Sequence, residues 1–159
     1  RRPLALLLVD ADCFKPLNDA RGHLHGDECL RALAQLCTGF APRRDDLVAR
    51  YGGEELVLLL PGRDLRAARR IAERLRRAVE ALDLPHPASP VAAHVTVSVG
   101  ASMAHPDDGA PDRLVAAADR ALYAAKARGR NRVVALGADA RRARSLSKQS
   151  RRSSPIEAA

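Results

Sequence analysis

Arg50-Tyr51-Gly52-Gly53-Glu54-Glu55-Leu56-Val57-Leu58-Leu59-Leu60 is the stretch that decides the fold. Gly52 and Gly53 separate two extended runs, residues 47–51 and 54–60. Two glycines between runs of strand length are typical of a two-residue β-hairpin turn. We therefore expect an antiparallel hairpin that carries two adjacent carboxylates, Glu54 and Glu55, directly after its turn.

Strands and helices alternate outward from this hairpin. Apolar runs and alternation predict further strands at residues 4–10, 95–99 and 132–136. Apolar residues at helical spacing predict three helices. The first begins near Asp27, the second covers residues 65–82 and the third covers residues 114–125. We interpret Arg69, Arg70, Arg76 and Arg77 as a solvated face of the 65–82 helix. This order favours an α/β (α+β) fold with a mixed central β-sheet and surrounding helices, rather than a purely parallel sheet.

The composition is that of one soluble domain. The 159 residues are 47% apolar but only 3% aromatic, so Leu, Val and Ala must build the core. No apolar run approaches the roughly 18 residues of a membrane span, and the start does not resemble a signal peptide. Three cysteines without metal-type pairing indicate free thiols in a reducing compartment, so we expect a cytoplasmic domain.

Half of the net charge of +8 lies in the last residues of the chain. Residues 139–159 hold six Lys or Arg against one Asp and one Glu, which gives +4. Because this Ser- and Arg-rich segment has few apolar residues to bury, we expect a disordered basic tail at 137–159 after a folded domain at 1–136. Its charge could suit nucleic acid or an acidic membrane, but a solvated extension is the simpler interpretation.

The hairpin also predicts where the carboxylates lie. If 54–60 pairs antiparallel with 4–10, Asp10 and Glu54 share one rim of the sheet, with Glu55 close by. Clustered carboxylates need a counter-charge, which a hard divalent cation supplies through oxygen ligands. Basic residues that could hold phosphates near this rim are Lys15, Lys126 and Arg130. Together these groups are suited to phosphoryl or nucleotidyl transfer.

Three segments in order then resemble the signature of one family. The first is Asp10-Ala11-Asp12-Cys13-Phe14-Lys15-Pro16-Leu17-Asn18-Asp19 with Gly22-His23 and Gly26-Asp27, the second is the hairpin, and the third is Ala118-Asp119 through Tyr123, Lys126 and Gly129-Arg130-Asn131. They resemble the GGDEF family of diguanylate cyclase catalytic domains, in its GGEEF form, up to about Val134. The resemblance implies a palm-like, nucleotidyl-cyclase-like fold with an active-site hairpin.

The resemblance also implies roles for the acidic residues. Asp10 and Glu54 would hold two Mg²⁺ or Mn²⁺ ions per active site, with help from the carbonyl of Ala11. Glu55 would act in catalysis and on the second metal. Asn18 and Asp27 would bind the guanine base of GTP, with His23 nearby.

The phosphate contacts follow in the same way. The backbone around Cys13 and Phe14, with Lys15, would cradle phosphates, and Lys126 and Arg130 would hold the terminal ones. Gly52 and Gly53 lack side chains, so nucleotide could approach the hairpin closely.

The implied reaction joins two GTP molecules. The 3′-hydroxyl of one attacks the α-phosphorus of the other, pyrophosphate leaves, and a second round closes cyclic di-GMP. Since each domain of this family holds one GTP, we expect a homodimer that faces its two GTP sites toward each other.

A short motif predicts product inhibition. Arg43-Arg44-Asp45-Asp46 resembles the family's RxxD site, with Arg43 and Asp46 in the two fixed positions. Arg74 resembles the arginine that clamps cyclic di-GMP from a neighbouring domain. RxxD occurs easily by chance, so its place six residues before Gly52 carries the argument.

Taken singly, these residues have plainer interpretations, as a turn residue for Asp10 or helix-dipole partners for Lys126 and Arg130.

The sequence departs from the family's pattern at two positions, because Leu56 replaces the usual Phe and Cys13 replaces an aromatic residue. The alternative function is a catalytically weak domain that acts as a GTP or cyclic di-GMP receptor, against which the intact Gly-Gly-Glu-Glu core argues, whereas no specific nucleic-acid binding is expected. The family's opening helix and turn are missing before Arg1, so we expect N-terminal sensor or regulatory domains, and membrane attachment through them stays open.

Overall fold

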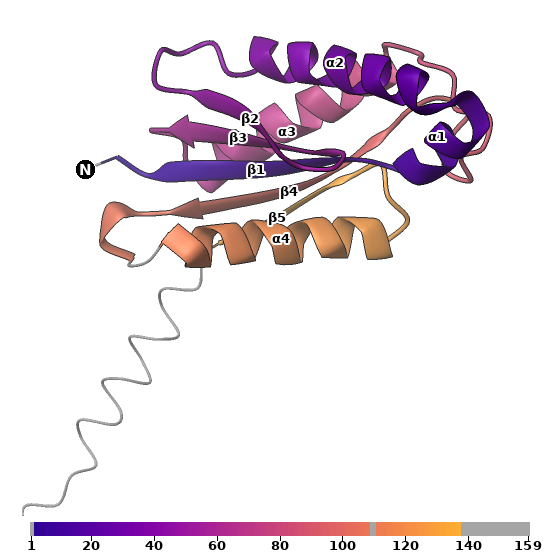
Figure 1. Ribbon diagram of the computed structural model, residues 1–159. Coiled ribbons are helices and arrows are strands. Elements are labelled where there is room, and N and C mark those ends of the chain that lie inside the picture. The colour runs from indigo at the N-terminus through magenta and orange to yellow at the C-terminus, as the bar shows by residue number, and fades with distance from the viewer. Residues whose placement is uncertain (1, 109–110, 138–159) are drawn as a thin grey trace, which may run out of the picture.

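The computed structural model describes residues 2–108 and 111–137, which form one mixed sheet with helices on both faces (Figure 1). The strand order is β2-β3-β1-β4-β5. The strands are β1 (Leu4–Ala11), β2 (Leu47–Gly52), β3 (Glu55–Pro61), β4 (Val97–Ala104) and β5 (Val133–Gly137). The mixed α/β (α+β) sheet expected from the sequence is confirmed.

Strand β1 is the centre of the sheet. It pairs antiparallel with β3 on one side and β4 on the other, while β5 joins β4 in parallel. Because both neighbours and both faces are covered, all of β1 except Leu4 is buried. This placement explains why residues 4–9 are a continuous apolar run.

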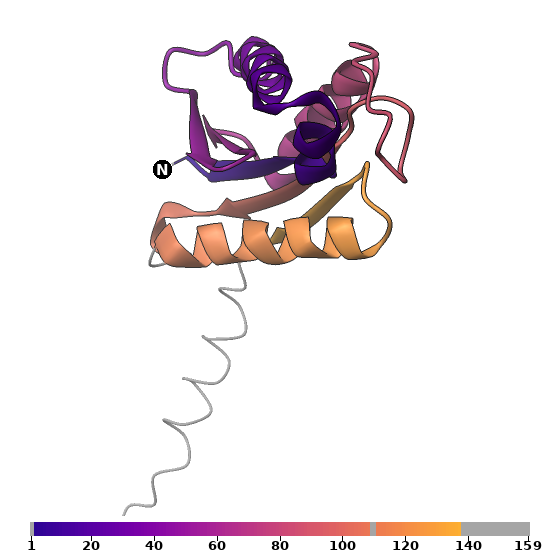
Figure 2. The same cartoon turned by 45° about the vertical axis from the view of Figure 1, so that its right-hand side comes forward.

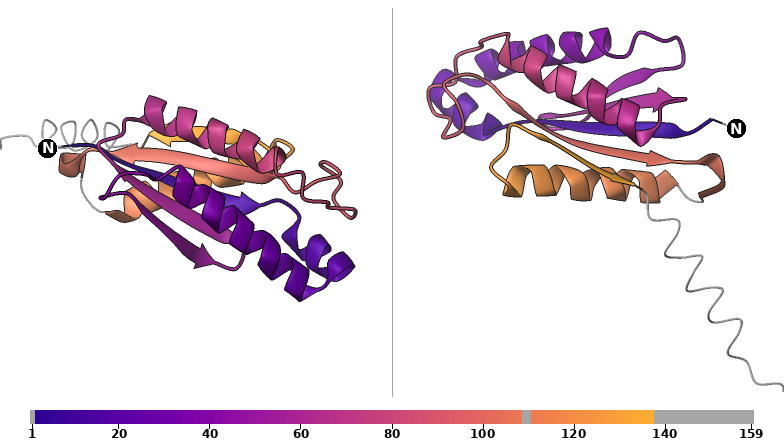
Figure 3. Two further views of the ribbon diagram at one scale, coloured as in Figure 1. Left: turned by 90° about the horizontal axis from the view of Figure 1, so that it is seen from above. Right: turned by 180° about the vertical axis from the view of Figure 1, so that it is seen from behind.

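The helices divide between the two faces. They are α1 (Phe14–Arg21), α2 (His23–Gly39), α3 (Leu65–Glu80) and α4 (Pro111–Ala127), with a short 3₁₀ turn η1 (Pro106–Asp108). Helices α2 and α3 lie over one face and α4 over the other, as Figure 2 and both views of Figure 3 show. Each face has its own apolar cluster, one around Leu7 and Leu58 and one around Leu6 and Leu8.

Gly100 allows α4 to lie directly against β4. A Cβ at this position would collide with the backbone of Ala118 and Leu122. Since β4 and β5 are parallel neighbours, α4 must cross over the sheet between them, and this close approach sets its depth. Within the described residues no helix is long and apolar enough to cross a membrane.

Two sequence-based expectations need correction. Helix α1 was missed, because only Phe14 and Leu17 of its eight residues are buried and no periodic pattern arises. Gly22, with φ of 86°, separates α1 from α2, which therefore begins at His23 rather than near Asp27. The basic tail expected at 137–159 lies outside the described residues beyond Gly137.

Candidate active site

The β2–β3 hairpin turns one residue later than the glycine pair suggests. Gly52 pairs with Glu55, so the two-residue turn is Gly53-Glu54 and not Gly52-Gly53. The register shifts between Arg50 and Gly52, which leaves Tyr51 as the extra residue of a bulge. Gly53 has φ of 48°, and its carbonyl accepts a 2.7 Å hydrogen bond from Arg50 Nε.

The carboxylates meet at the rim where the sequence placed them. Asp10, at the end of β1, is the direct cross-strand partner of Glu55, and Glu54 lies next to it in the turn. Burial raises the pKa of Asp10 to about 6; Lys126 opposes this shift, and the negative charges of Glu54 and Glu55 add to it. The shared rim of Asp10, Glu54 and Glu55 is therefore confirmed.

Lys126 reaches this rim from α4. Its Nζ lies 2.7 Å from Asp10 Oδ2 and forms an ion pair with a nearly buried carboxylate. Lys15 is not part of this pair, since it is exposed on α1 and bonds Asp19 at 3.0 Å. Of the two lysines expected near phosphates, the structure joins Lys126 to the carboxylates and leaves Lys15 on the surface.

The donor set fits a cation that is bound together with phosphates. Among the residues that the structure describes, no three His, Cys, Asp or Glu side chains are arranged to enclose a metal ion. Mg²⁺, however, is usually bound by one or two carboxylates, with substrate phosphates and water completing its shell. Asp10 and Glu54 are two carboxylates of this kind at one rim of the sheet.

The residues expected to bind the base lie around the α1–α2 junction. Asn18 Oδ1 is buried and has no hydrogen-bond partner among the described residues. A Cβ at Gly26 would collide with this Asn18 oxygen, so Gly26 makes room for it. Asp27 lines a cleft of about 410 Å³ between α2 and the hairpin, whose walls include Leu30, Ala34 and Leu56. His23 is exposed at the start of α2.

The start of α1 is shaped by a left-handed residue. Cys13 precedes the helix with φ of 57° and gives no side-chain cap, so the first amides of α1 stay free of such a partner. The Cys13 carbonyl accepts a 3.0 Å hydrogen bond from Nε2 of His86, which is buried at 1% exposure. This histidine was not singled out in the sequence, because it lies 73 residues away in the chain.

Asp12 is a structural acid that sequence reasoning left without a role. It is 2% exposed and accepts hydrogen bonds from Thr96 Oγ1 at 2.8 Å, Ser98 Oγ at 2.7 Å and the Asn131 amide at 3.0 Å. Asp12 thus ties the end of β1 to β4 and to the turn after α4. The sequence offered one signal for Asp12, because it follows Asp10 by two residues, the spacing of side chains on one face of a strand. Strand β1, however, ends at Ala11, so Asp12 lies just beyond it.

The α4–β5 turn contains three residues in succession with positive φ. The angles are 103° for Gly129, 61° for Arg130 and 44° for Asn131. A left-handed conformation costs about 1–2 kcal/mol for a residue other than glycine, and asparagine tolerates it better than arginine. Arg130 therefore adopts its conformation because surrounding contacts impose it.

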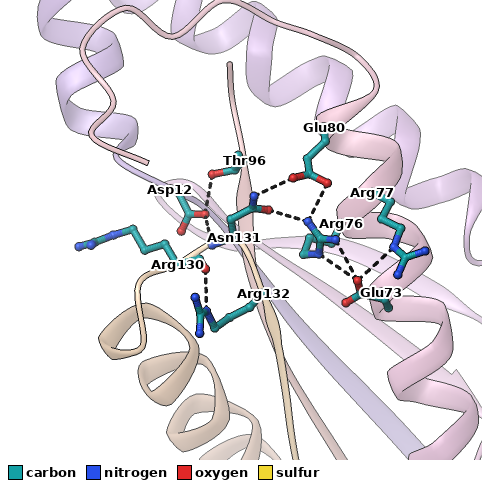
Figure 4. Close-up of polar contacts among 9 residues, drawn as sticks. All are labelled: Asp12, Glu73, Arg76, Arg77, Glu80, Thr96, Arg130, Asn131 and Arg132. Carbon is teal, nitrogen blue, oxygen red and sulfur yellow. Dashed lines mark hydrogen bonds and ion pairs between the residues drawn. The ribbon is translucent and has the colours of Figure 1, made fainter. Parts of the chain in front are cut away.

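Helix α3 contacts this turn at Asn131, the residue after Arg130, as Figure 4 shows. Arg76 Nη1 donates to Asn131 Oδ1 at 2.8 Å, and Asn131 Nδ2 donates to Glu80 Oε1 at 2.7 Å. Arg76 also pairs with Glu73 at 2.9 Å and with Glu80 at 2.7 Å. Hydrogen bonds from Arg76 and Asn131 hold the pKa of Glu73 and Glu80, respectively, below the ordinary value.

The solvated-face interpretation of the α3 arginines is wrong for Arg76. Its side chain is only 13% exposed, whereas that of Arg77 is 71% exposed. Helical periodicity places both residues near the polar face, but only Arg76 meets the α4–β5 turn. Arg69 and Arg70 are exposed as expected.

The residues expected to bind product lie at the other end of β2. Arg43 and Asp46 close a turn in which the Arg43 amide donates to Asp46 Oδ2 at 3.0 Å. Asp46 is also paired with Arg63 at 3.3 Å, and its side chain is fully buried. Arg74 lies on α3 with its guanidinium 5.7 Å from the centre of the Phe40 ring.

The cysteines are free thiols. Burial raises the pKa of Cys29 to about 11 and that of Cys37 to about 12, so neither is a reactive nucleophile. Cys13 is partly exposed beside the site.

Comparisons with known proteins agree on one family. Residues 1–132 match the family "Diguanylate cyclase, GGDEF domain". The response regulator PleD of Caulobacter vibrioides is 42% identical over 132 residues, which are 83% of this chain and 29% of PleD. Diguanylate cyclase DosC of Escherichia coli is 43% identical over 133 residues, 82% of this chain and 28% of DosC. The chain thus spans under a third of the length of these relatives.

Solved structures show the same fold. The GGDEF domain of DgcB from Caulobacter crescentus, in complex with c-di-GMP, matches with a TM-score of 0.74 and 32% identity, over 84% of this chain and 77% of that one. The active GGEEF domain of a diguanylate cyclase from Vibrio cholerae matches with a TM-score of 0.73 and 33% identity, over 85% of this chain and 83% of that one.

Proposed function

This chain belongs to the GGDEF family of diguanylate cyclase domains, and from that premise we propose that it condenses two GTP into cyclic di-GMP with release of pyrophosphate. One observation carries the proposal. The β1–β3 register sets Asp10 against Glu55 beside the Gly53-Glu54 turn, and Lys126 reaches the same rim. At this edge of the sheet the acidic groups would hold cations and the basic group would hold phosphates.

Two divalent cations, Mg²⁺ or Mn²⁺, would neutralise the phosphates and lower the pKa of the attacking 3′-hydroxyl when bound. Asp10, Glu54 and the carbonyl of Ala11 would hold them, and Glu55 would act in catalysis. A cation would also replace Lys126 as the counter-charge of Asp10. Lys126 could then turn from the carboxylate to the terminal phosphates.

The base pocket supports guanine. Asn18 Oδ1 is a buried acceptor without a partner in the part of the chain that the structure describes, and guanine N1 and N2 are donors that could supply one. Asp27 at the nearby cleft would accept the second donor, with His23 beside it. Because adenine lacks the N2 donor and an unpaired buried acceptor costs about 1–3 kcal/mol, we expect roughly ten- to a hundredfold preference for GTP over ATP.

The phosphates would lie between α1 and α4. Free amides near Cys13 and Phe14 offer donors at the start of α1, and Lys15 adds charge there. Arg130 and Lys126 would hold the terminal phosphates from the opposite side.

Catalysis would need two copies of the chain. Each site holds one GTP and presents it to the other across a twofold axis. N-terminal sensor or regulatory domains would control this meeting. A cytoplasmic location of this domain fits its substrate, and attachment of the whole protein to a membrane would come from those other regions.

Product would restrain the enzyme at the Arg43–Asp46 turn and at Arg74, where Asp46, buried against Arg63, would hold the turn that presents Arg43. The six residues of β2, at about 3.3 Å each, separate the Arg43–Asp46 turn from the hairpin by about 20 Å. Cyclic di-GMP bound there, with Arg74 of a neighbouring domain, would hold two domains in an arrangement that keeps their GTP sites apart.

The deciding experiment is incubation of the chain with GTP and Mg²⁺ at high protein concentration, with product analysis by mass spectrometry. Cyclic di-GMP and pyrophosphate should form from GTP, not from ATP, and chelation with EDTA should stop the reaction. Tight binding of cyclic di-GMP without any synthesis would instead support the alternative, a receptor domain. The intact Gly-Gly-Glu-Glu hairpin favours the enzyme over the receptor.

A further inference from the structure

The turn between α4 and β5 is held by α3, which supplies none of the residues proposed to bind the cations, the base or the phosphates. Gly129, Arg130 and Asn131 all have positive φ, and α3 contacts this turn through the Asn131 side chain. Arg76 and Glu80 lie one helical turn apart on α3, so both can reach the same amide group.

Both polar atoms of the Asn131 side-chain amide form hydrogen bonds to α3. Its oxygen accepts from Arg76 and its nitrogen donates to Glu80, at 2.8 and 2.7 Å. Aspartate could accept from Arg76 but would place a second negative charge against Glu80. Asparagine also tolerates the left-handed conformation, so the residue suits both the backbone and the clamp.

The backbone of the same residue is fixed from the other side. The Asn131 amide donates to Asp12, which Thr96 and Ser98 hold in the buried end of the sheet. Asn131 is therefore held by α3 through its side chain and by Asp12, the residue after β1, through its main chain (Figure 4).

Arg130 directly precedes this fixed residue. Its backbone carbonyl accepts from Arg132 Nε at 2.8 Å and its amide donates to Ala125 at 3.1 Å. Its side chain, by contrast, extends away from the network in Figure 4. The backbone of Arg130 is thus fixed while its guanidinium remains available for a ligand.

We propose that Asn131 is a positioning residue, which, clamped by Arg76 and Glu80 of α3, aims Arg130 at the β- and γ-phosphates of the bound nucleotide. This inference rests on the proposed function, because the ligand is GTP. Asn131 itself touches no phosphate. It acts by holding an arginine in a backbone conformation that arginine would not choose alone.

Two variants break the clamp in different places. Asn131→Gly keeps the left-handed backbone and the amide to Asp12 but removes the bonds to α3. Arg76→Ala removes the Arg76 half of the clamp from the helix side and leaves the bond from Asn131 to Glu80. Arg77→Ala is the matched control, since Arg77 also pairs with Glu73 but is largely exposed and does not contact Asn131.

The probes are GMP and a GTP analogue whose α,β-bridging oxygen is replaced by methylene, so that no turnover occurs. Both clamp variants should weaken binding of the analogue roughly tenfold, the loss of one charge-assisted hydrogen bond, while GMP binding stays unchanged. Hydrogen exchange at the amides of Arg130 and Asn131 should accelerate in both variants. Arg77→Ala should change neither quantity.

A double-substitution cycle separates positioning from general support. In an Arg130→Ala background, Arg76→Ala should cause no further loss of analogue binding, because it acts through Arg130. A full additional loss would overturn the proposal, and so would equal weakening of GMP and analogue. Faster exchange with unchanged ligand preference would overturn it as well.

Failure of the proposed function has a different pattern. A wild-type chain that binds neither GMP nor the analogue, even with Mg²⁺, overturns the guanine-nucleotide function and this inference with it. A wild-type chain that binds both, with a preference that the clamp variants leave untouched, overturns only the inference.

Discussion

Two turns bring the site together, and they are held in different ways. The Gly53-Glu54 turn is placed by the β2–β3 ladder, one glycine with φ of 48° and one bond from Arg50. The Gly129–Asn131 turn has three positive φ values and is held by Asp12 and by α3. The first turn is a local structure, whereas the second depends on residues far apart in the chain.

Because the two turns are held differently, we expect substitutions in the first to affect the reaction and substitutions around the second to affect the stability of the fold. Changes in the hairpin turn should alter the reaction while the fold persists, because few contacts depend on its side chains. Removal of Asp12, which holds the second turn from the buried side, should loosen the fold, since the buried polar groups around it satisfy one another.

The largest effect is expected from Glu54→Gln. Removing one negative ligand from a site for hard cations should lower cyclic di-GMP synthesis by at least about a hundredfold. Binding of GTP should fall less, because contacts to base and phosphates remain. Initial rates and calorimetry measure the two quantities, and an unchanged melting temperature is the control. Full activity would remove Glu54 from the mechanism.

Asp12→Ala should give the largest loss of stability. It leaves two hydroxyls and one amide without their acceptor in a buried place, which should lower the free energy of unfolding by about 3 kcal/mol. Urea denaturation measures this value.

The matched control for Asp12 is Asp19→Ala. Asp19 is an exposed carboxylate paired with Lys15, and its removal should change the free energy of unfolding by less than about 1 kcal/mol. Equal losses for the two variants would contradict the contrast between buried network and surface.

Arg43→Ala extends the contrast to the far end of β2. Loss of a charge-assisted contact to cyclic di-GMP should raise the product concentration needed for half-inhibition by about tenfold or more. Initial rates, measured before product accumulates, should stay largely unchanged. Undiminished inhibition in this variant would speak against the site, as would strictly competitive inhibition against GTP in the wild type.

The smallest effect compares two adjacent glycines. Gly53→Ala should cost about 1 kcal/mol of stability because of its left-handed φ. Gly52 has no positive φ and open space around it, so Gly52→Ala should leave the free energy of unfolding unchanged. Reduced GTP binding by Gly52→Ala would then report contact with nucleotide. A larger stability loss for Gly52 than for Gly53 would reverse the assignment of the turn.

Most of the sheet could be predicted from the sequence, and so could the rim that joins Asp10 to Glu55. Helix α1 could not, since eight residues with two buried side chains produce no period. The turn was displaced by one residue because a bulge at Tyr51 depends on pairing with β3. Arg76 was wrongly expected to be solvated. Helical spacing identifies the polar face of α3, but it does not show that the α4–β5 turn packs against part of that face.

The sequence by itself determined the hairpin, the mixed sheet and the family, because strand alternation, glycines and motif order are local properties of the chain. Tertiary structure alone decided that Lys126 meets Asp10, that Asp12 is structural, and that Arg76 and Glu80 clamp Asn131. These contacts join residues 51 to 119 positions apart. No local pattern encodes such pairs, since they form only when α3 and α4 pack against the sheet whose central strand is β1.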